Sequence, residues 1–394
     1  MSFKNTVGPY LFSAILLGYP LFSSIANIIG VENRILSVFF RATLLLFSVS
    51  IIYVNLVRLQ SIKLPQFNLG ILFVVFSFVF LFFLRAGLDT FLYLNDVNAM
   101  LDFWVFAVFV TLIPNVAFFF QLNNLQEAKV IKVGMYFGMM VASIFLIAYL
   151  KSVNFNILNI FSGRANLQGL NPITIGHLGL TLILLAFAFI MTNDGSHILP
   201  KLVSFISLFL GGTILIAGGS RGPLLSLFIC IVFIFVFSKN KKIINYIYFT
   251  IVIILLIFLY SSSDVMLFNR VSNGFLEDEA RDSILIDTIS HIINNIYIGS
   301  GILSLEVYPH NILLESFLVL GLIGGTLFLS ILIFCCYQIC FLYSTGKSIV
   351  FPLLYIQFLT FNMVSGTINE AFSFWLLSTC IIYYSFKTIT SKDS

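Results

Sequence analysis

Four polar side chains could carry out chemistry in a chain that is otherwise overwhelmingly apolar: Arg164, Arg221, Arg281 and His310. A guanidinium presents a planar fork of donors that suits diphosphate and carboxylate groups, and it keeps its charge at any working pH. A neutral imidazole can accept a proton from a sugar hydroxyl near neutral pH. Asn311 follows His310 directly and could bind the same substrate. These residue types predict a site that binds an anionic group and activates an alcohol beside it.

Each of the four also has a structural interpretation. Arg221 could extend to lipid headgroups, Arg164 could be solvated in its loop, and His310 could be an ordinary hydrogen-bonded side chain. Arg281 could form a local ion pair with the acidic residues at 277–278. Against these readings, small residues flank Arg221 in GGSRGP and allow a phosphate or another backbone to approach closely. An arginine near membrane depth is also costly enough to indicate a function.

The sequence predicts neither a metal nor a cofactor. It contains no His-x-x-x-His pair and no carboxylate cluster at ligand spacing, and all five cysteines fall inside apolar runs. There is no Walker loop and no Rossmann turn for a nucleotide. Of the remaining histidines, His177 lies one turn into an apolar run and could line a cavity, whereas His291 is expected to be structural.

The composition decides the class of protein that must position these residues. Of the 394 residues, 60% are hydrophobic and only 9% are charged, whereas a soluble domain carries about 25% charged residues. This excludes a water-soluble enzyme and predicts an all-α polytopic membrane protein with one integral membrane domain over residues 1–394. It indicates membrane lipid as a partner and no nucleic acid. No cleavage site follows the first apolar stretch, so we expect that stretch to remain as a membrane anchor.

About twelve stretches are long and apolar enough to span a bilayer, which takes about 20 residues. They are 8–30, 35–57, 68–84, 97–120, 135–150, 172–191, 202–219, 223–237, 243–260, 316–342, 348–364 and 372–386. With the N-terminus in the cytoplasm, every lysine except Lys151 falls on the cytoplasmic side, as the positive-inside rule requires. We therefore expect both termini in the cytoplasm.

The arginines are distributed differently from the lysines. Six are predicted in external loops, while Arg41 lies in the outer half of the second span and Arg58 is internal. The six are Arg34, Arg85, Arg164, Arg221, Arg270 and Arg281. Topology alone would treat lysine and arginine alike, so we expect the external arginines to have a function.

Two external loops are long, a second loop at 151–171 and a main loop at 261–311. The main loop contains DEARDSILIDTISHIINNIYIGSG, in which apolar residues recur at helical spacing until Gly299. This pattern predicts an amphipathic helix that lies over the membrane surface and ends at the glycines. The main loop is therefore expected to be folded.

Three stretches resemble motifs of the O-antigen polymerase and O-antigen ligase superfamily of bacterial surface-polysaccharide assembly. GGSRGPLLSL (218–227) resembles the family's Ser-Arg-Gly turn between two spans. ARDSILIDTISHIINNIYIGSGI (280–302) resembles its arginine-led external helix, which ends at a Gly-x-Gly. HNILLESFLVLGLIGG (310–325) resembles its His-Asn entry to a span with a Gly-Leu-x-Gly step. The resemblance is specific over residues 160–330 and otherwise rests on hydropathy.

The resemblance implies a GT-C-type membrane glycosyltransferase whose active site lies at the periplasmic face of the bacterial inner membrane. Its substrate would be an undecaprenyl-diphosphate-linked oligosaccharide, and its partners a chain-length regulator and a flippase. Arg221 and Arg281 would hold the diphosphate, with Arg164 at a position that varies more within the family. His310 would act as general base toward the acceptor hydroxyl, with Asn311 beside it. The resemblance implies no divalent metal.

Within the superfamily we expect the polymerase, which transfers the glycan to another lipid-linked repeat unit. The stretch SGRANLQGLNPITIGHL is closer to polymerases in style, and a main loop at 261–311 is short for a ligase. The Arg-x-ten-Gly spacing of polymerases is not present, since Ile175 stands at the glycine position after Arg164. The alternative is the ligase, which transfers the glycan to lipid A–core. A transporter of lipid-linked sugar is a third reading, although the two halves of the chain are dissimilar.

Overall fold

The computed structural model describes residues 7–57, 69–92, 97–156, 164–192, 198–238, 279–302 and 309–390. Within these ranges every regular element is a helix, apart from one isolated bridge between Leu167 and Leu170. The elements are α1 (Val7–Ile29), α2 (Asn33–Val57), α3 (Leu69–Leu92), α4 (Val97–Trp104), η3 (Val105–Leu112), α5 (Ile113–Phe119), η4 (Leu122–Asn124), α6 (Glu127–Ser152), α8 (Pro172–Thr192), α9 (Ile198–Gly218), α10 (Arg221–Phe237), α13 (Glu279–Asn294), α14 (Ile312–Ser344), α15 (Val350–Ser365) and α16 (Phe372–Thr390). The predicted all-α class is confirmed.

Eight helical stretches in the described ranges are long and apolar enough to cross a membrane, and three shorter apolar helices, α10, α15 and α16, accompany them. These coincide with the predicted spans, except that the span predicted at 243–260 lies outside the described residues. The segments 261–278 and 303–308 of the predicted main loop lie outside them as well. The chain is a multi-span membrane protein built from helices.

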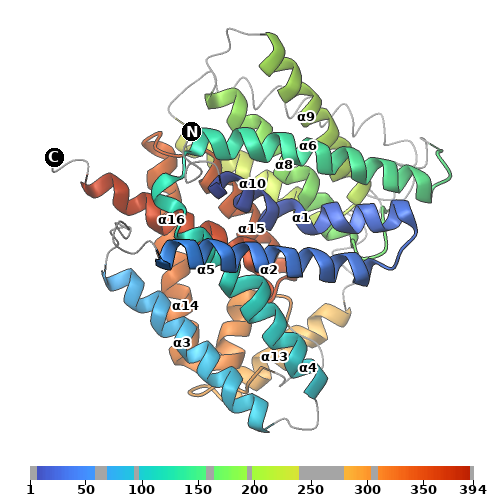
Figure 1. Ribbon diagram of the computed structural model, residues 1–394. Coiled ribbons are helices and arrows are strands. Elements are labelled where there is room, and N and C mark those ends of the chain that lie inside the picture. Colours follow the sequence, from blue (N-terminus) through green and yellow to red (C-terminus); the bar gives the residue numbers. More distant parts are fainter. Residues whose placement is uncertain are drawn as a thin grey trace.

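Helix α8 forms the centre of the bundle, because all of its residues from Ile175 to Phe189 are buried. It packs against α6, α9, α10 and α15. Figure 1 shows α1, α6 and α8 as neighbours in the upper half of the view, with α3 and α14 below them. At the α8–α9 contact, Gly179 and Gly211 bring the two backbones so close that a Cβ on either would collide with the other helix. Such small residues let helices pack closely without a hydrophobic driving force.

Two arginines predicted in loops lie on helices. α3 continues to Leu92, so Arg85 is on its last turns, and Arg34 is in the first turn of α2. The predicted spans counted apolar residues only, whereas the helix continues through polar ones. In α3, Arg85 pairs with Asp89 one turn later, and the Thr90 hydroxyl donates to the Ala86 carbonyl. These local bonds make polar side chains compatible with the helix.

Helix α14 is broken at Gly321, where the predicted span 316–342 shows no interruption. Gly321 has φ 64° and ψ −159°, a conformation open in practice only to glycine. A straight helix would separate Phe317 and Gly325 by about 12 Å along its axis. Here the Phe317 ring lies directly against Gly325. The chain therefore turns sharply at Gly321, and the segments 312–320 and 322–344 pack on each other.

The loop 366–371, between α15 and α16, is held on two sides. The Thr111 hydroxyl of the π-helical stretch η3 donates to the Asn369 carbonyl at 2.7 Å. The buried Glu315 of α14 accepts a hydrogen bond from the Ile368 amide at 2.8 Å. π-helical turns are rare and are frequent at functional sites. The loop is thereby fixed beside the ends of α14 and α15.

Candidate functional site at the helix ends

His310 stands directly before α14 in a conformation that few side chains adopt. Its φ is 53°, in the left-handed region, which a non-glycine residue enters at an energetic cost. Asn311 then caps α14, since its Oδ1 accepts hydrogen bonds from the Leu313 and Leu314 amides at 3.0 Å. Its Nδ2 donates to the Met363 carbonyl at 3.1 Å. The asparagine thus holds the His310 backbone in place relative to the end of α15.

Arg221 is the first residue of α10 and its side chain is exposed. The turn before it needs glycine, because Gly219 has φ 54° and a Cβ on Gly218 would clash with the backbone of α8. On the other side, a Cβ on Gly222 would lie 4.0 Å from both His177 Nε2 and Val364 Cγ1. The small residues of the turn therefore serve close packing against α8, and they place Arg221 beside the end of α15.

Arg164 lies next to this turn. Its exposed side chain passes Gly219, with Cγ 3.7 Å from the position of a Cβ there, and the next amide, that of Ala165, donates to the Ala217 carbonyl at 2.8 Å. The rest of the loop is tied to α1, because the Tyr19 hydroxyl donates to the Gly169 carbonyl at 2.8 Å. Residues 164–171 of the second loop are thus held against α1 and against the end of α9.

The structure brings three of the four predicted residues to one region. A Cβ on Gly222, next to Arg221, would lie 4.0 Å from Val364 Cγ1, and Arg164 lies against the Arg221 turn. Asn311 donates a hydrogen bond to the Met363 carbonyl. Met363 and Val364 belong to the last turn of α15. The C-terminal end of α15 is therefore the common neighbour around which Arg164, Arg221 and the His310–Asn311 pair are arranged.

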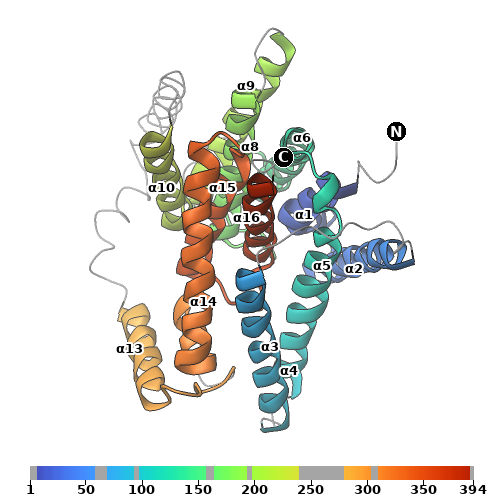
Figure 2. The same cartoon turned by 90° about the vertical axis from the view of Figure 1, so that its left-hand side faces the viewer.

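Arg281 lies in the first turn of α13, and its side chain is outside the described part of the structure. A helix lies in the predicted stretch, but it ends at Asn294 and not at Gly299, and it packs on α14. Figure 2 shows α13 at the edge of the molecule beside α14. On α13, the Thr288 side chain is fully buried, whereas the Ile293 side chain stays largely exposed.

The segment after α13 fits into the break of α14. The Ser300 amide donates to the Leu318 carbonyl at 2.6 Å, and the Leu322 amide donates to the Ile296 carbonyl at 2.7 Å. In a continuous helix the Leu322 amide would bond to the Leu318 carbonyl. Here the Leu318 carbonyl and the Leu322 amide each bond to the segment after α13 in place of each other. A Cβ on Gly299 or Gly321 would collide with the opposite backbone, so the glycines of two separately predicted motifs pack against each other.

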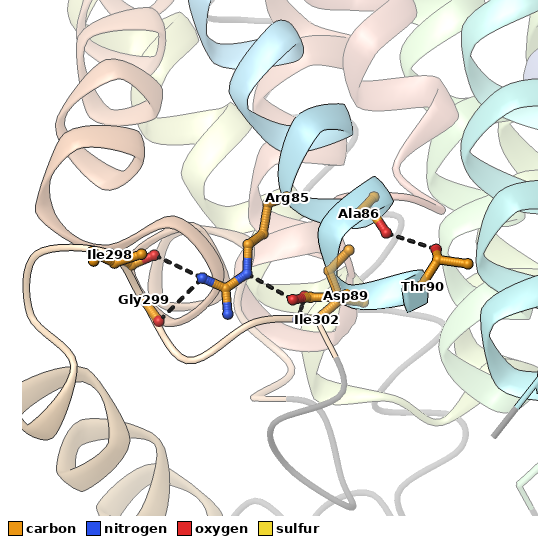
Figure 3. A network of polar contacts seen from close by, with 7 residues as sticks. All are labelled: Arg85, Ala86, Asp89, Thr90, Ile298, Gly299 and Ile302. Carbon is orange, nitrogen blue, oxygen red and sulfur yellow. Dashed lines mark hydrogen bonds and ion pairs between the residues drawn. The ribbon is translucent and has the colours of Figure 1, made fainter. Parts of the chain in front are cut away.

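Arg85 and Asp89 of α3 hold this segment from the other side (Figure 3). Arg85 Nε lies 2.9 Å from Asp89 Oδ1, and Arg85 Nη1 donates to the Ile298 carbonyl at 3.2 Å. Asp89, which is fully buried, accepts a hydrogen bond from the Ile302 amide at 2.7 Å through Oδ2. Arg85 therefore has a structural function, and it positions α13 with Arg281 relative to α14.

A cavity of about 320 Å³ lies beside the Arg221 turn, between α1, α2, α8, α15 and the loop 366–371. Nothing in the sequence indicated this cavity as a whole. His177, which was expected to line a cavity, does line this one. Arg41 and Glu370 also line it. The Arg41 guanidinium lies over the Phe106 ring, 4.5 Å from its centre. In the sequence, Glu370 is an isolated acidic residue between two apolar runs. Only this isolation could have identified it as a candidate site residue.

The charges around this cavity influence one another. Burial raises the pKa of Glu370, the positive charge of Arg41 opposes that rise, and the negative charge of Asp102 adds to it. A charge near a group shifts its pKa in the direction that favours opposite signs. The Arg41 guanidinium is thus close enough to favour an ionised Glu370, although the two make no direct ion pair in the described structure.

Within the described residues, no group of three or more His, Cys, Asp or Glu side chains is placed to hold a metal ion. Comparison with models of known protein families finds no match, and neither does comparison with curated proteins. The class that the fold and the site define is a multi-span helical membrane protein with arginine, histidine and asparagine gathered at its helix ends.

Proposed function

We propose that the protein is a GT-C-type membrane glycosyltransferase with twelve spans, and specifically an O-antigen polymerase of the bacterial inner membrane. Its site would face the periplasm, and both termini the cytoplasm. It would transfer an undecaprenyl-diphosphate-linked glycan to a sugar of another lipid-linked repeat unit. The observation that carries the proposal is the arrangement of Arg164, Arg221 and His310–Asn311 around the end of α15. These residues come from three separate parts of the chain.

In this reaction an acceptor hydroxyl attacks the anomeric carbon of the donor. The new C–O bond forms as the bond to the diphosphate oxygen breaks, and the hydroxyl proton passes to His310. Negative charge develops on the departing lipid diphosphate, and the positive charges of Arg221 and Arg281 stabilise it. Arg164 adds a further contact at the edge. Displacement by one direct attack inverts the anomeric centre.

The left-handed backbone of His310 supports its assignment as general base. Such a conformation persists only where surrounding contacts determine it, and it concentrates at functional sites. The Asn311 side chain supplies those contacts through three hydrogen bonds, two to α14 and one to α15. A base must be held within hydrogen-bond reach of the proton that it accepts.

A transporter of lipid-linked sugar is the second candidate. It is favoured by one observation, the cavity inside the bundle that Arg41, His177 and Glu370 line. Ionisable side chains in such a position mark substrate pathways in membrane proteins. The ligase shares donor and leaving group with the polymerase and differs from it only in the acceptor.

One experiment distinguishes these functions. A bacterial strain that lacks the gene is complemented with the wild-type chain, with His310→Ala, with Arg221→Ala or with Arg34→Ala, and the surface polysaccharide is resolved by gel electrophoresis. Arg34 is exposed at the start of α2 and serves as the matched control. We expect a ladder of chain lengths from the wild type and the control, and core carrying a single repeat from the two site variants, at equal protein levels in the membrane.

Other outcomes would contradict the polymerase. Accumulation of long lipid-linked polymer in the gene-deleted strain would indicate a ligase. Accumulation of single lipid-linked repeats on the cytoplasmic side would indicate a transporter. A normal ladder from the His310→Ala strain would exclude the general-base assignment.

A further inference from the structure

The cavity beside the Arg221 turn is lined by two charged side chains, Arg41 and Glu370. In the described structure neither the Arg41 guanidinium nor the Glu370 carboxylate forms a hydrogen bond or a direct ion pair. The Arg41 guanidinium instead lies between aromatic rings, 4.5 Å from the centre of Phe106 and 5.8 Å from that of Tyr19. An attraction to ring faces uses none of the N–H groups in a hydrogen bond, so they stay available to a ligand. Both hydrogen-bond donors and acceptors are therefore offered to the same space.

His177 adds a third polar group to the cavity. The side chain is 4% exposed and packs on the Phe361 ring. The Gln357 side-chain amide donates its two hydrogens to the His177 carbonyl at 2.9 Å and to the Thr181 hydroxyl at 2.8 Å, and its nitrogen lies 3.5 Å from His177 Nδ1. His177 Nε2 is buried and has no partner among the described residues, and a polar atom buried without a hydrogen bond is destabilising.

These groups select a class of ligand. The carboxylate of Glu370 disfavours a second anion, and the charges of Arg41 and Glu370 disfavour a lipid chain. A polyhydroxylated ligand fits, because each hydroxyl both donates and accepts and the apolar face of a sugar ring can lie on aromatic walls. The cavity volume of about 320 Å³ lies at the lower end of the ~300–1,000 Å³ range of small-molecule sites. The cavity could therefore hold a small part of a saccharide.

The position of the cavity indicates which part of the saccharide it would hold. His177 Nε2 lies 4.0 Å from the position of a Cβ on Gly222, the residue after Arg221. We infer that the cavity binds the sugar residue next to the diphosphate of the lipid-linked donor, with Glu370 and Arg41 bonded to its hydroxyls and His177 Nε2 hydrogen-bonded to one of them. This inference rests on the proposed function, since it places the diphosphate at Arg221.

Two lipids test the inference. The full chain, purified in lipid nanodiscs, is titrated with undecaprenyl diphosphate, which lacks sugar, and with the lipid-linked repeat unit extracted from a strain that lacks the gene. The ratio of the two dissociation constants measures what the sugar contributes. We expect the wild type to bind the sugar-bearing lipid at least about tenfold more tightly, which corresponds to about one hydrogen bond to a charged group.

Variants then locate that contribution. Glu370→Gln and Arg41→Met are expected to reduce the ratio toward one while leaving the affinity for undecaprenyl diphosphate unchanged. Arg221→Ala should reduce the affinity for both lipids by the same factor and leave the ratio of the dissociation constants as in the wild type. Arg34→Ala controls for surface charge, and size-exclusion chromatography confirms that each variant is folded.

Two results would overturn the inference in distinguishable ways. If the wild type binds both lipids and the ratio stays unchanged in Glu370→Gln and Arg41→Met, the cavity does not hold the sugar, and the proposed function stands. If the wild type binds neither lipid, the proposed function fails and the cavity assignment fails with it.

Discussion

Replacing Asp89 by alanine should release the segment after α13 from α3. Asp89 is fully buried, and the side chain of its partner Arg85 is only 17% exposed. Its carboxylate accepts from Arg85 Nε at 2.9 Å and from the Ile302 amide at 2.7 Å. Removing one partner of a buried ion pair costs about 3–5 kcal/mol, because the other charge is left uncompensated. In this case an amide loses its acceptor as well.

This cost should appear as local opening of the segment 295–302. The amides of Ser300 and Leu322 are good reporters, because they bond to backbone carbonyls across the break of α14 and not to Asp89. A loss of about 3 kcal/mol corresponds to at least about a hundredfold loss of protection against hydrogen exchange, at 1.4 kcal/mol per tenfold. The measurement is deuterium exchange by mass spectrometry on the purified membrane protein.

The control and a graded variant make the test specific. Asp102→Ala removes an exposed carboxylate from α4 and should leave exchange at Ser300 and Leu322 unchanged. Asp89→Asn retains an oxygen for the Ile302 amide and should give an intermediate loss. Unchanged exchange in Asp89→Ala would refute the idea that α3 holds this segment. Equal increases in Asp89→Ala and Asp102→Ala would refute it too.

Four further predictions concern the helix break, the general base, the arginine of α13 and the main loop. Gly321→Ala should lower the thermal unfolding midpoint, because the added Cβ would collide with the Tyr297 carbonyl group. In the control Gly87→Ala the added Cβ meets nothing within 4 Å, so the midpoint should stay unchanged or rise. Equal midpoints for the two variants would contradict the assigned turn. His310→Asn should keep the folded state, since asparagine tolerates the left-handed region, yet abolish the polysaccharide ladder; a normal ladder would mean that only the backbone conformation matters. Arg281→Lys should also abolish the ladder if a planar fork is required, and full activity would reduce this residue to a point charge. A cysteine in place of Asn273 should react with an impermeant maleimide added outside the inner membrane, and protection there would remove the periplasmic site.

Much of the candidate site could be predicted from local sequence. His310 next to Asn311 before a long apolar run predicted the start of a helix there. The cap that Asn311 provides was not predicted, although a cap depends only on the residues within one turn. The GGSRGP turn likewise placed Arg221 at the start of a span. The prediction failed where helix ends depended on polar residues, as for Arg85, which lies on α3 and serves the fold. Asp89 and Glu370 carried no local pattern that distinguished them from solvated acids.

The apolar composition and the lengths of the apolar runs by themselves determined that the chain is a bundle of membrane-spanning helices, because in lipid each helix must satisfy its own backbone hydrogen bonds. Only the tertiary structure decided where α14 breaks. The carbonyl of Leu318 and the amide of Leu322 are released there because backbone groups of 296–300 take their places. Only the tertiary structure brought Arg41 of α2 and Glu370 of the last loop to one cavity. Such pairings join residues far apart in the chain, which no local pattern of residue types can specify.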